Sequence, residues 1–172
     1  AVVTFVTTME RARDMKQKPV RIAGMQGIRS GREEFIFAPP GLGISQQPSD
    51  GNHARAKDQE VYRAAGVERS DVKGLYTYDA FSPLPLFTLE RFGFCGTGEA
   101  ADFVQDGTIG PGGSLPVNTN GGLLSEAHVA GWNHIREMTR QLRGTAGERQ
   151  IPGADVLQWG TVWGDSVIMT AA

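Results

Sequence analysis

The chain has 172 residues and a net charge of -2, which suits one domain of ordinary size and lacks the basic excess of a nucleic-acid-binding protein. Its single cysteine, Cys95, excludes an internal disulfide framework and is typical of a reducing, cytoplasmic compartment. No apolar run approaches the roughly 20 residues that a membrane-spanning helix needs, so we expect no membrane contact.

The first residues form a continuous apolar segment, Ala1-Val2-Val3-Thr4-Phe5-Val6, whose β-branched side chains predict a buried strand. Thr8 is a typical N-cap and predicts a helix that Pro19 ends. A short strand is predicted over residues 20–23. Turn signals between residues 27 and 53 predict an irregular loop that is functional or contacts a partner.

Strand and helix patterns then alternate along the chain, which predicts an α/β fold. Gly66 and Gly144 stand where a glycine commonly ends a helix. A glycine-rich loop is predicted over 93–122. The other predicted helices cover 54–65, 83–92 and 125–142, and the other predicted strands cover 74–78, 156–157 and 166–170.

Three patterns suggest sites but favour plainer interpretations. Gly96-Thr97-Gly98-Glu99-Ala100-Ala101 has the letters of a dinucleotide-binding fingerprint, but a predicted helix precedes it where a strand is required. His53, His128 and His134 make no metal-binding pattern, so we expect neither a metal nor another cofactor. Cys95 lies beside an aromatic residue, which favours a packing role over a nucleophilic one.

The stretch from Val117 to His128 is more informative. Its glycine pair, Gly121-Gly122, allows backbone to approach a ligand closely. The predicted helix that follows offers free amides to a developing oxyanion, and it places His128 in its first turn. A glycine-rich turn with a half-exposed histidine explains the same pattern.

A second stretch places Tyr78 and Asp79 at a strand-to-helix junction. In α/β folds, the carboxyl ends of strands are where ligands and chemistry concentrate. The alternative, which the pattern alone favours, is a core tyrosine followed by a capping aspartate.

Together these stretches resemble the C-terminal half of the thiolase superfamily. Tyr78-Asp79-Ala80-Phe81 resembles that family's Asn-Glu-Ala-Phe or His-Asp-Cys-Phe motif. The stretch from Asn118 resembles its Asn-x-x-Gly-Gly…Gly-His-Pro motif, with Ala127-His128-Val129 in place of Gly-His-Pro. The segment 159–164 takes the place of a closing Cys-x-Gly-Gly-Gly loop, and residues 143–150 are similar to a recurring stretch of the lipid-transfer-protein-like branch.

The resemblance implies an α/β, thiolase-like fold, in which this chain is the C-terminal βαβαβ half of a five-layered α/β/α/β/α sandwich. Residues 1–22 would be the end of an N-terminal half whose remainder is missing, and residues 23–172 would be the C-terminal domain. The family forms homodimers. Its aldolase branch also works with a small acyl-CoA-binding subunit of OB-fold and zinc-ribbon type.

Within the superfamily, the chain most resembles the lipid-transfer-protein-like aldolases, which release a short acyl-CoA from the CoA-linked side chain of a steroid. Tyr78 stands where those aldolases carry a tyrosine. His128 stands where they tend to carry a second tyrosine, and this departure is thiolase-like. The absence of the closing cysteine favours the aldolase.

The leading hypothesis is therefore an acyl-CoA carbon–carbon lyase that cleaves a β-hydroxyacyl-CoA to a ketone or aldehyde and a shorter acyl-CoA. Coenzyme A enters as part of the substrate. Tyr78 and His128 are the expected catalytic residues, acting on the protons of the β-hydroxyl and the α-carbon. The expected substrate- and oxyanion-binding residues are Asn118, Gly121, Gly122, Gly160 and Gly164.

Two other classes of function stay open at this point. The first is a β-ketoacyl-CoA thiolase, an acyltransferase whose nucleophilic cysteine would lie in the absent N-terminal half. The second is a lipid or CoA carrier that kept the fold and lost the chemistry. A count of the catalytic residues in the complete chain separates the lyase from the thiolase, and turnover of any β-hydroxyacyl-CoA would exclude the carrier.

Overall fold

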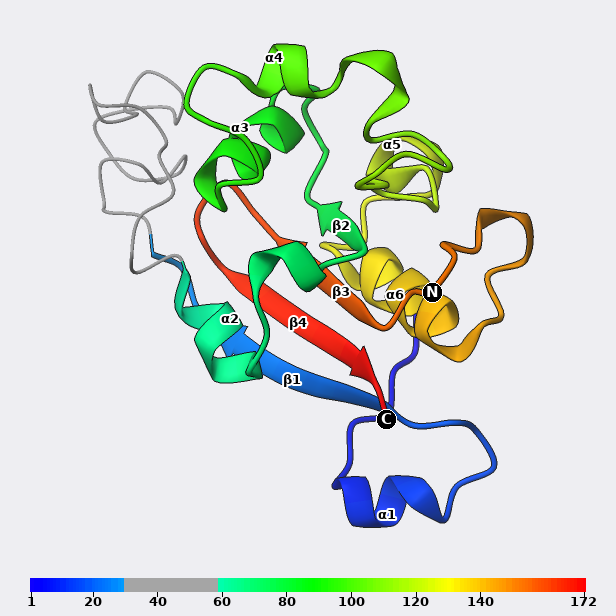
Figure 1. Ribbon diagram of the computed structural model, residues 1–172. Coiled ribbons are helices and arrows are strands. Elements are labelled where there is room, and N and C mark those ends of the chain that lie inside the picture. The colour runs from blue at the N-terminus through cyan, green and yellow to red at the C-terminus, as the bar shows by residue number, and fades with distance from the viewer. Residues whose placement is uncertain (30–58) are drawn as a thin grey trace.

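The computed structural model describes residues 1–29 and 59–172, which build a four-stranded sheet flanked by helices (Figure 1). The strands are β1 (Val20–Gln26), β2 (Gly74–Thr77), β3 (Val156–Gly160) and β4 (Ser166–Ala171), in the order β1-β4-β3-β2. β2 and β3 run parallel, whereas β4 is antiparallel to both of its neighbours. The carboxyl ends of β2 and β3 therefore lie at the same end of the sheet.

Helices cover both faces of this sheet because neighbouring strand residues point to opposite sides. On one face, Leu75 and Ile168 pack with residues of α2 (Glu60–Ala65) and α3 (Leu84–Arg91). On the other face, Tyr76 and Met169 pack with α6 (Trp132–Arg143). Each face thus has its own apolar core, and the sheet lies between the two.

Close packing of α2 on β1 depends on a glycine. A Cβ at Gly24 would lie 2.7 Å from the carbonyl oxygen of Val61 and 2.9 Å from the amide of Ala65. The pairing of β1 with β4 shifts register between Ile22 and Gly24, which is the mark of a bulge. Gly66 ends α2 with a left-handed backbone, as its position in the sequence predicts.

Shorter helices complete the fold. They are α1 (Met9–Arg13), α4 (Ala100–Phe103) and α5 (Gly122–Ser125), together with the 3-10 turns η4 (Arg69–Asp71), η5 (Gln105–Gly107) and η6 (Gly147–Arg149). Within the described ranges, no helix combines the length and the apolar character needed to cross a bilayer.

The predicted α/β class is confirmed, and each strand predicted from residue 20 onward is present. The predicted domain boundary between residues 22 and 23 falls inside β1, and the assignment of residues 1–22 to another half stays a prediction. The turns predicted from residue 30 to 53 and the start of the helix predicted at 54 lie outside the described residues.

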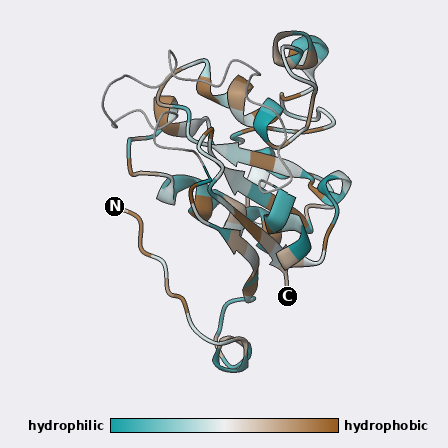
Figure 2. Cartoon of the chain, turned by 90° about the vertical axis from the view of Figure 1, so that its left-hand side faces the viewer, coloured by the Kyte–Doolittle hydropathy of each residue, from teal (hydrophilic) through white to brown (hydrophobic). Residues whose placement is uncertain are grey.

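The strand predicted over residues 1–6 is wrong. That segment has no regular structure and runs outside the body of sheet and helices (Figure 2). Val3, Phe5 and Val6 are 72–87% exposed. β-branched residues favour a strand only where a neighbouring strand supplies hydrogen bonds and a packing surface, and the described residues supply neither here.

Candidate functional site

The carboxyl end of β2 is fixed by an asparagine clamp. The N–H of Thr77 donates to Asn118 Oδ1 at 2.8 Å, and Asn118 Nδ2 donates to the carbonyl of Thr77 at 3.1 Å. Asn118 adopts a left-handed backbone with φ of 48°, which asparagine tolerates better than most residues. Both polar atoms of the Asn118 side chain are therefore bonded to the backbone of Thr77, so Asn118 fixes the strand end that precedes Tyr78.

Tyr78 and His128, 50 residues apart in the sequence, meet at this end of the sheet. Tyr78 Oη lies 3.0 Å from His128 Nε2, and the two ring centroids are 5.6 Å apart. Tyr78 is half-buried, whereas His128 is exposed. A phenol and an imidazole at hydrogen-bond distance form a pair that can pass a proton to and from a substrate.

The loop after β3 covers the tyrosine. The ring of Trp163 lies 5.9 Å from that of Tyr78, with the planes tilted by 44°. The carbonyl of Trp163 accepts the N–H of Arg29, which ties this loop to the segment after β1. From the sequence, residues 159–164 were predicted only to take the place of the family's closing loop. No sequence pattern indicated that Trp163 contacts Tyr78.

The prediction that His128 lies in the first turn of a long helix is wrong. α5 ends at Ser125, and α6 begins only at Trp132. Between them Ala130 and Gly131 both have positive φ, of 50° and 86°, which interrupts a helix. His128 is therefore presented by a loop, and the dipole of α6 does not begin at its side.

Asp79 caps the start of α5. Its Oδ1 accepts the backbone N–H of Leu123 at 2.9 Å. Asp79 is thus a capping aspartate, but of a helix 44 residues further along the chain, and α3, the helix that follows it directly, has no side-chain cap. The sequence did not indicate its second neighbour: Nε2 of His134, fully buried in α6, lies 3.7 Å from the same oxygen.

Two of the four glycines predicted to bind an oxyanion have amides that are already engaged. The N–H of Gly121 donates to the carbonyl of Asn118 at 2.7 Å, and that of Gly164 donates to the carbonyl of Thr161 at 2.9 Å. Both glycines have positive φ, so both shape turns beside the Tyr78–His128 pair. Oxyanion binding by Gly121 and Gly164 stays a prediction, and these bonds weigh against it.

The other two glycines make room for side chains. A Cβ at Gly122 would lie 1.7 Å from Oδ2 of Asp79, and a Cβ at Gly160 would lie 2.7 Å from the ring of Phe92. Gly160 pairs with Thr77 and with Ser166 inside the sheet. Their roles as oxyanion donors stay predictions, while their small size is a requirement of packing.

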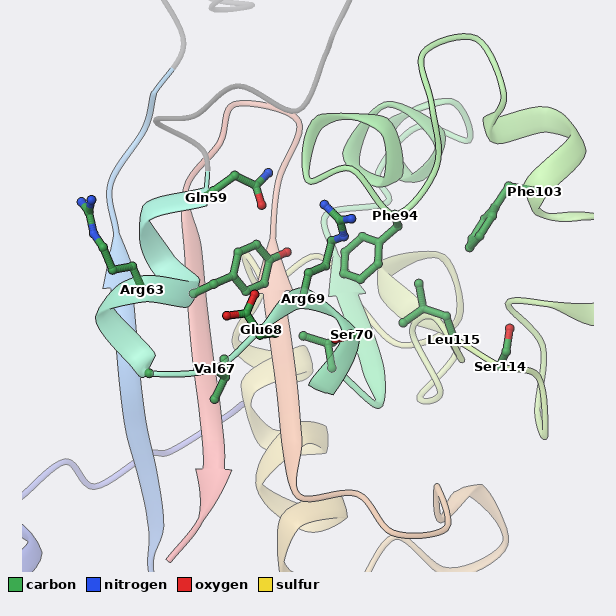
Figure 3. Close-up of a pocket in the computed structure, with 13 residues that line it drawn as sticks. Gln59, Arg63, Val67, Glu68, Arg69, Ser70, Phe94, Phe103, Ser114 and Leu115 are labelled. Atoms are coloured by element: carbon green, nitrogen blue, oxygen red, sulfur yellow. The ribbon is translucent and has the colours of Figure 1, made fainter.

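A hollow of about 760 Å³ lies elsewhere, against α2, η4 and the segments around Phe94 and Phe103 (Figure 3). It contains neither Tyr78 nor His128. Its tyrosine, Tyr62, donates its hydroxyl to Gln158 at 2.7 Å. Because no comparable pair of proton-transferring groups meets among the described residues that line this hollow, we place the candidate chemistry at the Tyr78–His128 end.

A metal centre is not apparent in the described part of the chain. Residues 1–29 and 59–172 contain no group of three or more histidine, cysteine, aspartate or glutamate side chains placed to hold an ion.

These features of fold and sequence define a class. Residues 44–170 match the thiolase C-terminal domain-like family, and the chain belongs to that family.

Individual relatives show a more specific similarity than the family does. The chain is 42% identical over 149 residues to 17-hydroxy-3-oxo-4-pregnene-20-carboxyl-CoA lyase of Mycobacterium tuberculosis, and 40% identical over 146 residues to the steroid side-chain-cleaving aldolase of Thermomonospora curvata. These matches cover 85% and 82% of this chain. A solved structure of Ltp2-ChsH2(DUF35) aldolase matches 95% of the chain with a TM-score of 0.79 and 34% identity.

The chain spans only a part of each relative's length. It covers 37% of the lyase, 35% of the aldolase and 42% of the chain in the solved structure. The activity of the whole protein is therefore a matter for proposal.

Proposed function

We propose that the protein is an acyl-CoA carbon–carbon lyase that cleaves a β-hydroxyacyl-CoA by a retro-aldol reaction. The observation that carries the proposal is the 3.0 Å contact between Tyr78 Oη and His128 Nε2 at the carboxyl end of β2. The names of the relatives, a CoA lyase and a side-chain-cleaving aldolase, support the same reaction class.

The reaction needs a base, an electron sink and an acid. In the proposed sequence Tyr78, as phenolate, takes the proton of the β-hydroxyl, and the β-carbon becomes a carbonyl as the bond to the α-carbon breaks. The electron pair of that bond moves into the thioester, which becomes an enolate. The Tyr78–His128 pair then returns the proton to the α-carbon, which gives the shorter acyl-CoA and restores the phenolate, so atoms and charge balance without an added reactant.

His128 has a clear part in this scheme. An imidazole N–H donated to Tyr78 Oη stabilises the oxygen when it carries negative charge. Trp163 covers the tyrosine ring from the loop after β3, and a contact of this kind limits the access of water. Asn118 keeps the end of β2 in place, which holds Tyr78 at a constant distance from the substrate.

The names of the relatives also support a class of substrate. We propose a CoA thioester of a steroid or comparable side chain, because both named relatives act on steroid-derived molecules. We further propose that the whole protein is a cytoplasmic homodimer that works with a second, small subunit. The hyphenated name of the matched aldolase supports such a subunit. Native mass spectrometry of the protein purified with and without that subunit measures both states.

The test follows cleavage of a β-hydroxyacyl-CoA by the full protein with no free CoA added. We expect a carbonyl product and a shorter acyl-CoA. Tyr78→Phe and His128→Ala should each lower kcat by roughly 100-fold or more, since general acid–base groups contribute about 10²–10⁴ in rate. Tyr62→Phe is the matched control, because that hydroxyl is bound to Gln158 in the other hollow, and it should leave kcat close to the wild-type value.

Other outcomes identify the other classes. Cleavage of a β-ketoacyl-CoA that requires free CoA would mark a thiolase. Binding of acyl-CoA without any turnover would mark a carrier. Equal activity of Tyr78→Phe and wild type would remove Tyr78 from the mechanism.

A further inference from the structure

A buried carboxylate and a buried histidine lie next to the proposed catalytic pair. Asp79 follows Tyr78 in the chain and is 7% exposed, and His134 in the first turn of α6 is 0% exposed. His134 Nε2 lies 3.7 Å from Asp79 Oδ1. Neither ring nitrogen of His134 has a hydrogen-bond partner among the described residues, although buried polar groups are normally bonded.

The same carboxylate joins the two segments that carry Tyr78 and His128. Oδ1 of Asp79 accepts the N–H of Leu123, in the short helix α5 that leads to His128. Gly122 approaches the carboxylate so closely that no other side chain fits at that position. A turn of the Asp79 carboxylate would therefore break its bond to Leu123 or press on Gly122, both in the helix that precedes the loop of His128.

We infer that Asp79 and His134 are a positioning couple for the Tyr78–His128 pair, in which His134 donates its Nε2–H to Asp79 and so orients the carboxylate toward Leu123. The inference rests on the proposed function. It needs the gap of 3.7 Å to shorten by less than 1 Å, to about the 2.9 Å of an ordinary N–H···O bond. His134 touches no reacting atom and acts through Asp79.

The protonation of His134 suits this role. Burial lowers the pKa of His134 below its usual value, although the charges of Asp79 and Glu126 oppose the shift, so the ring is neutral at neutral pH. A neutral imidazole carries one N–H, and the tautomer with that hydrogen on Nε2 is the one that faces Asp79. Tyr76, whose ring centroid is 6.1 Å from that of His134, packs beside it.

The kinetic test compares two substitutions in the full protein. His134→Gln keeps an N–H donor of similar reach, whereas His134→Leu fills the space without one. We expect His134→Leu to lower kcat by roughly 10- to 100-fold with KM within about twofold, because small misplacements of catalytic groups have effects of this size. His134→Gln should restore most of kcat. Leu142→Ala, on the same helix, controls for lost stability and should keep the wild-type kcat per folded molecule.

A second test is independent of turnover and survives a failure of the proposed function. Nitrogen-15 NMR of labelled histidines in the wild-type protein reports the tautomer of each ring. We expect His134 as the Nε2–H tautomer, and a shift of the His128 signal in His134→Leu in the same direction as in Tyr78→Phe. A wild-type His134 in the Nδ1–H form overturns the inference, even if His134→Leu does not fold. So do equal losses of kcat in the glutamine and leucine variants.

Discussion

Gly122 and Gly144 share a left-handed backbone, with φ of 70° and 73°, but differ in their surroundings. A Cβ at Gly144 meets nothing within 4 Å, whereas one at Gly122 meets the Asp79 carboxylate. Alanine at Gly144 should therefore cost only the backbone term of about 1 kcal/mol, or roughly 2–4 °C in Tm. Alanine at Gly122 should lower Tm by at least twice as much and should also reduce cleavage, because Asp79 must move.

Thermal unfolding followed by circular dichroism measures both variants, and kcat is measured well below Tm. Equal losses in Tm would show that the Asp79 carboxylate moves aside without cost. In that case its tie to α5 is looser than the 2.9 Å bond to Leu123 indicates.

Cys95 packs against the core between the sheet and α3, in agreement with the packing role predicted for it. Burial raises the pKa of its thiol to about 11, and the charges of Glu90 and Glu99 add to the shift. At pH 8 the thiolate is then roughly two hundred times scarcer than for an ordinary cysteine of pKa about 8.5. We expect Cys95 to react with a disulfide reagent roughly 20 times more slowly than an ordinary thiol, because the scarcity of its thiolate outweighs the greater nucleophilicity of that thiolate, and at the normal rate after unfolding. Fast labelling of the folded protein would contradict the shift.

At the scale of elements, a partly buried ion pair joins α6 to η6. Glu137 is fully buried and receives two hydrogen bonds from Arg149, each 3.1 Å long. Burial alone would raise the pKa of Glu137, but the hydrogen bonds and charge of Arg149, with Gln141 and Thr119, hold it below its usual value. A carboxyl with a depressed pKa stabilises the fold above its unfolded pKa, and this contribution is lost as the pH falls through the folded pKa.

We therefore expect Arg149→Met to reduce the free energy of unfolding at pH 7 by roughly 2 kcal/mol, less than the 3–5 kcal/mol of a fully buried pair because Arg149 is 43% exposed. The difference from wild type should shrink below about pH 4, as the carboxyl of Glu137 takes up a proton. Arg136→Met is the matched control, because Arg136 pairs with Glu126 at the surface at 3.8 Å and should cost at most about 0.5 kcal/mol. A loss that does not depend on pH would assign the effect of Arg149 to packing.

The elements also show where reading the sequence succeeds. Strands β3 and β4 and the glycine ends of α2 and α6 follow from local pattern, because hydrophobic runs and left-handed glycines act locally. The single helix predicted over 125–142 is wrong, because the structure has the end of α5 and then, after a loop, α6. Local propensity does not indicate the positive φ of Ala130 in that loop. A Cβ at Gly131 would lie 3.1 Å from the ring of Trp159, a constraint between distant residues that only the fold reveals.

The candidate site was predictable only in part. The meeting of Tyr78 with His128 followed from resemblance to a family, since 50 residues of spacing say nothing about contact. Trp163 and His134 were missed because their importance lies in what they face. Both reach the site from elements that pair or pack only after the sheet has formed.

At the scale of the molecule, the two apolar cores share the same four strands. Leu89 belongs to the core on the face of α2 and α3, and Leu142 belongs to the core on the face of α6. Leu89→Ala and Leu142→Ala should each cost about 2–5 kcal/mol. We expect both to shift circular dichroism and tryptophan fluorescence to one common midpoint, as a single cooperative unit requires. Two separated midpoints would show that the faces unfold independently.

The exposed segment Ala1–Val6 has a consequence for how the polypeptide behaves in a test tube. The six residues have no charged side chain and no proline, are rich in valine and include a phenylalanine, which is the composition of a steric zipper. We expect copies of the 172-residue chain in concentrated solution to associate through this segment as cross-β fibrils. The rest of each chain should stay folded. The fluorescence of thioflavin T should then increase with time, and Phe5→Lys should prevent this increase.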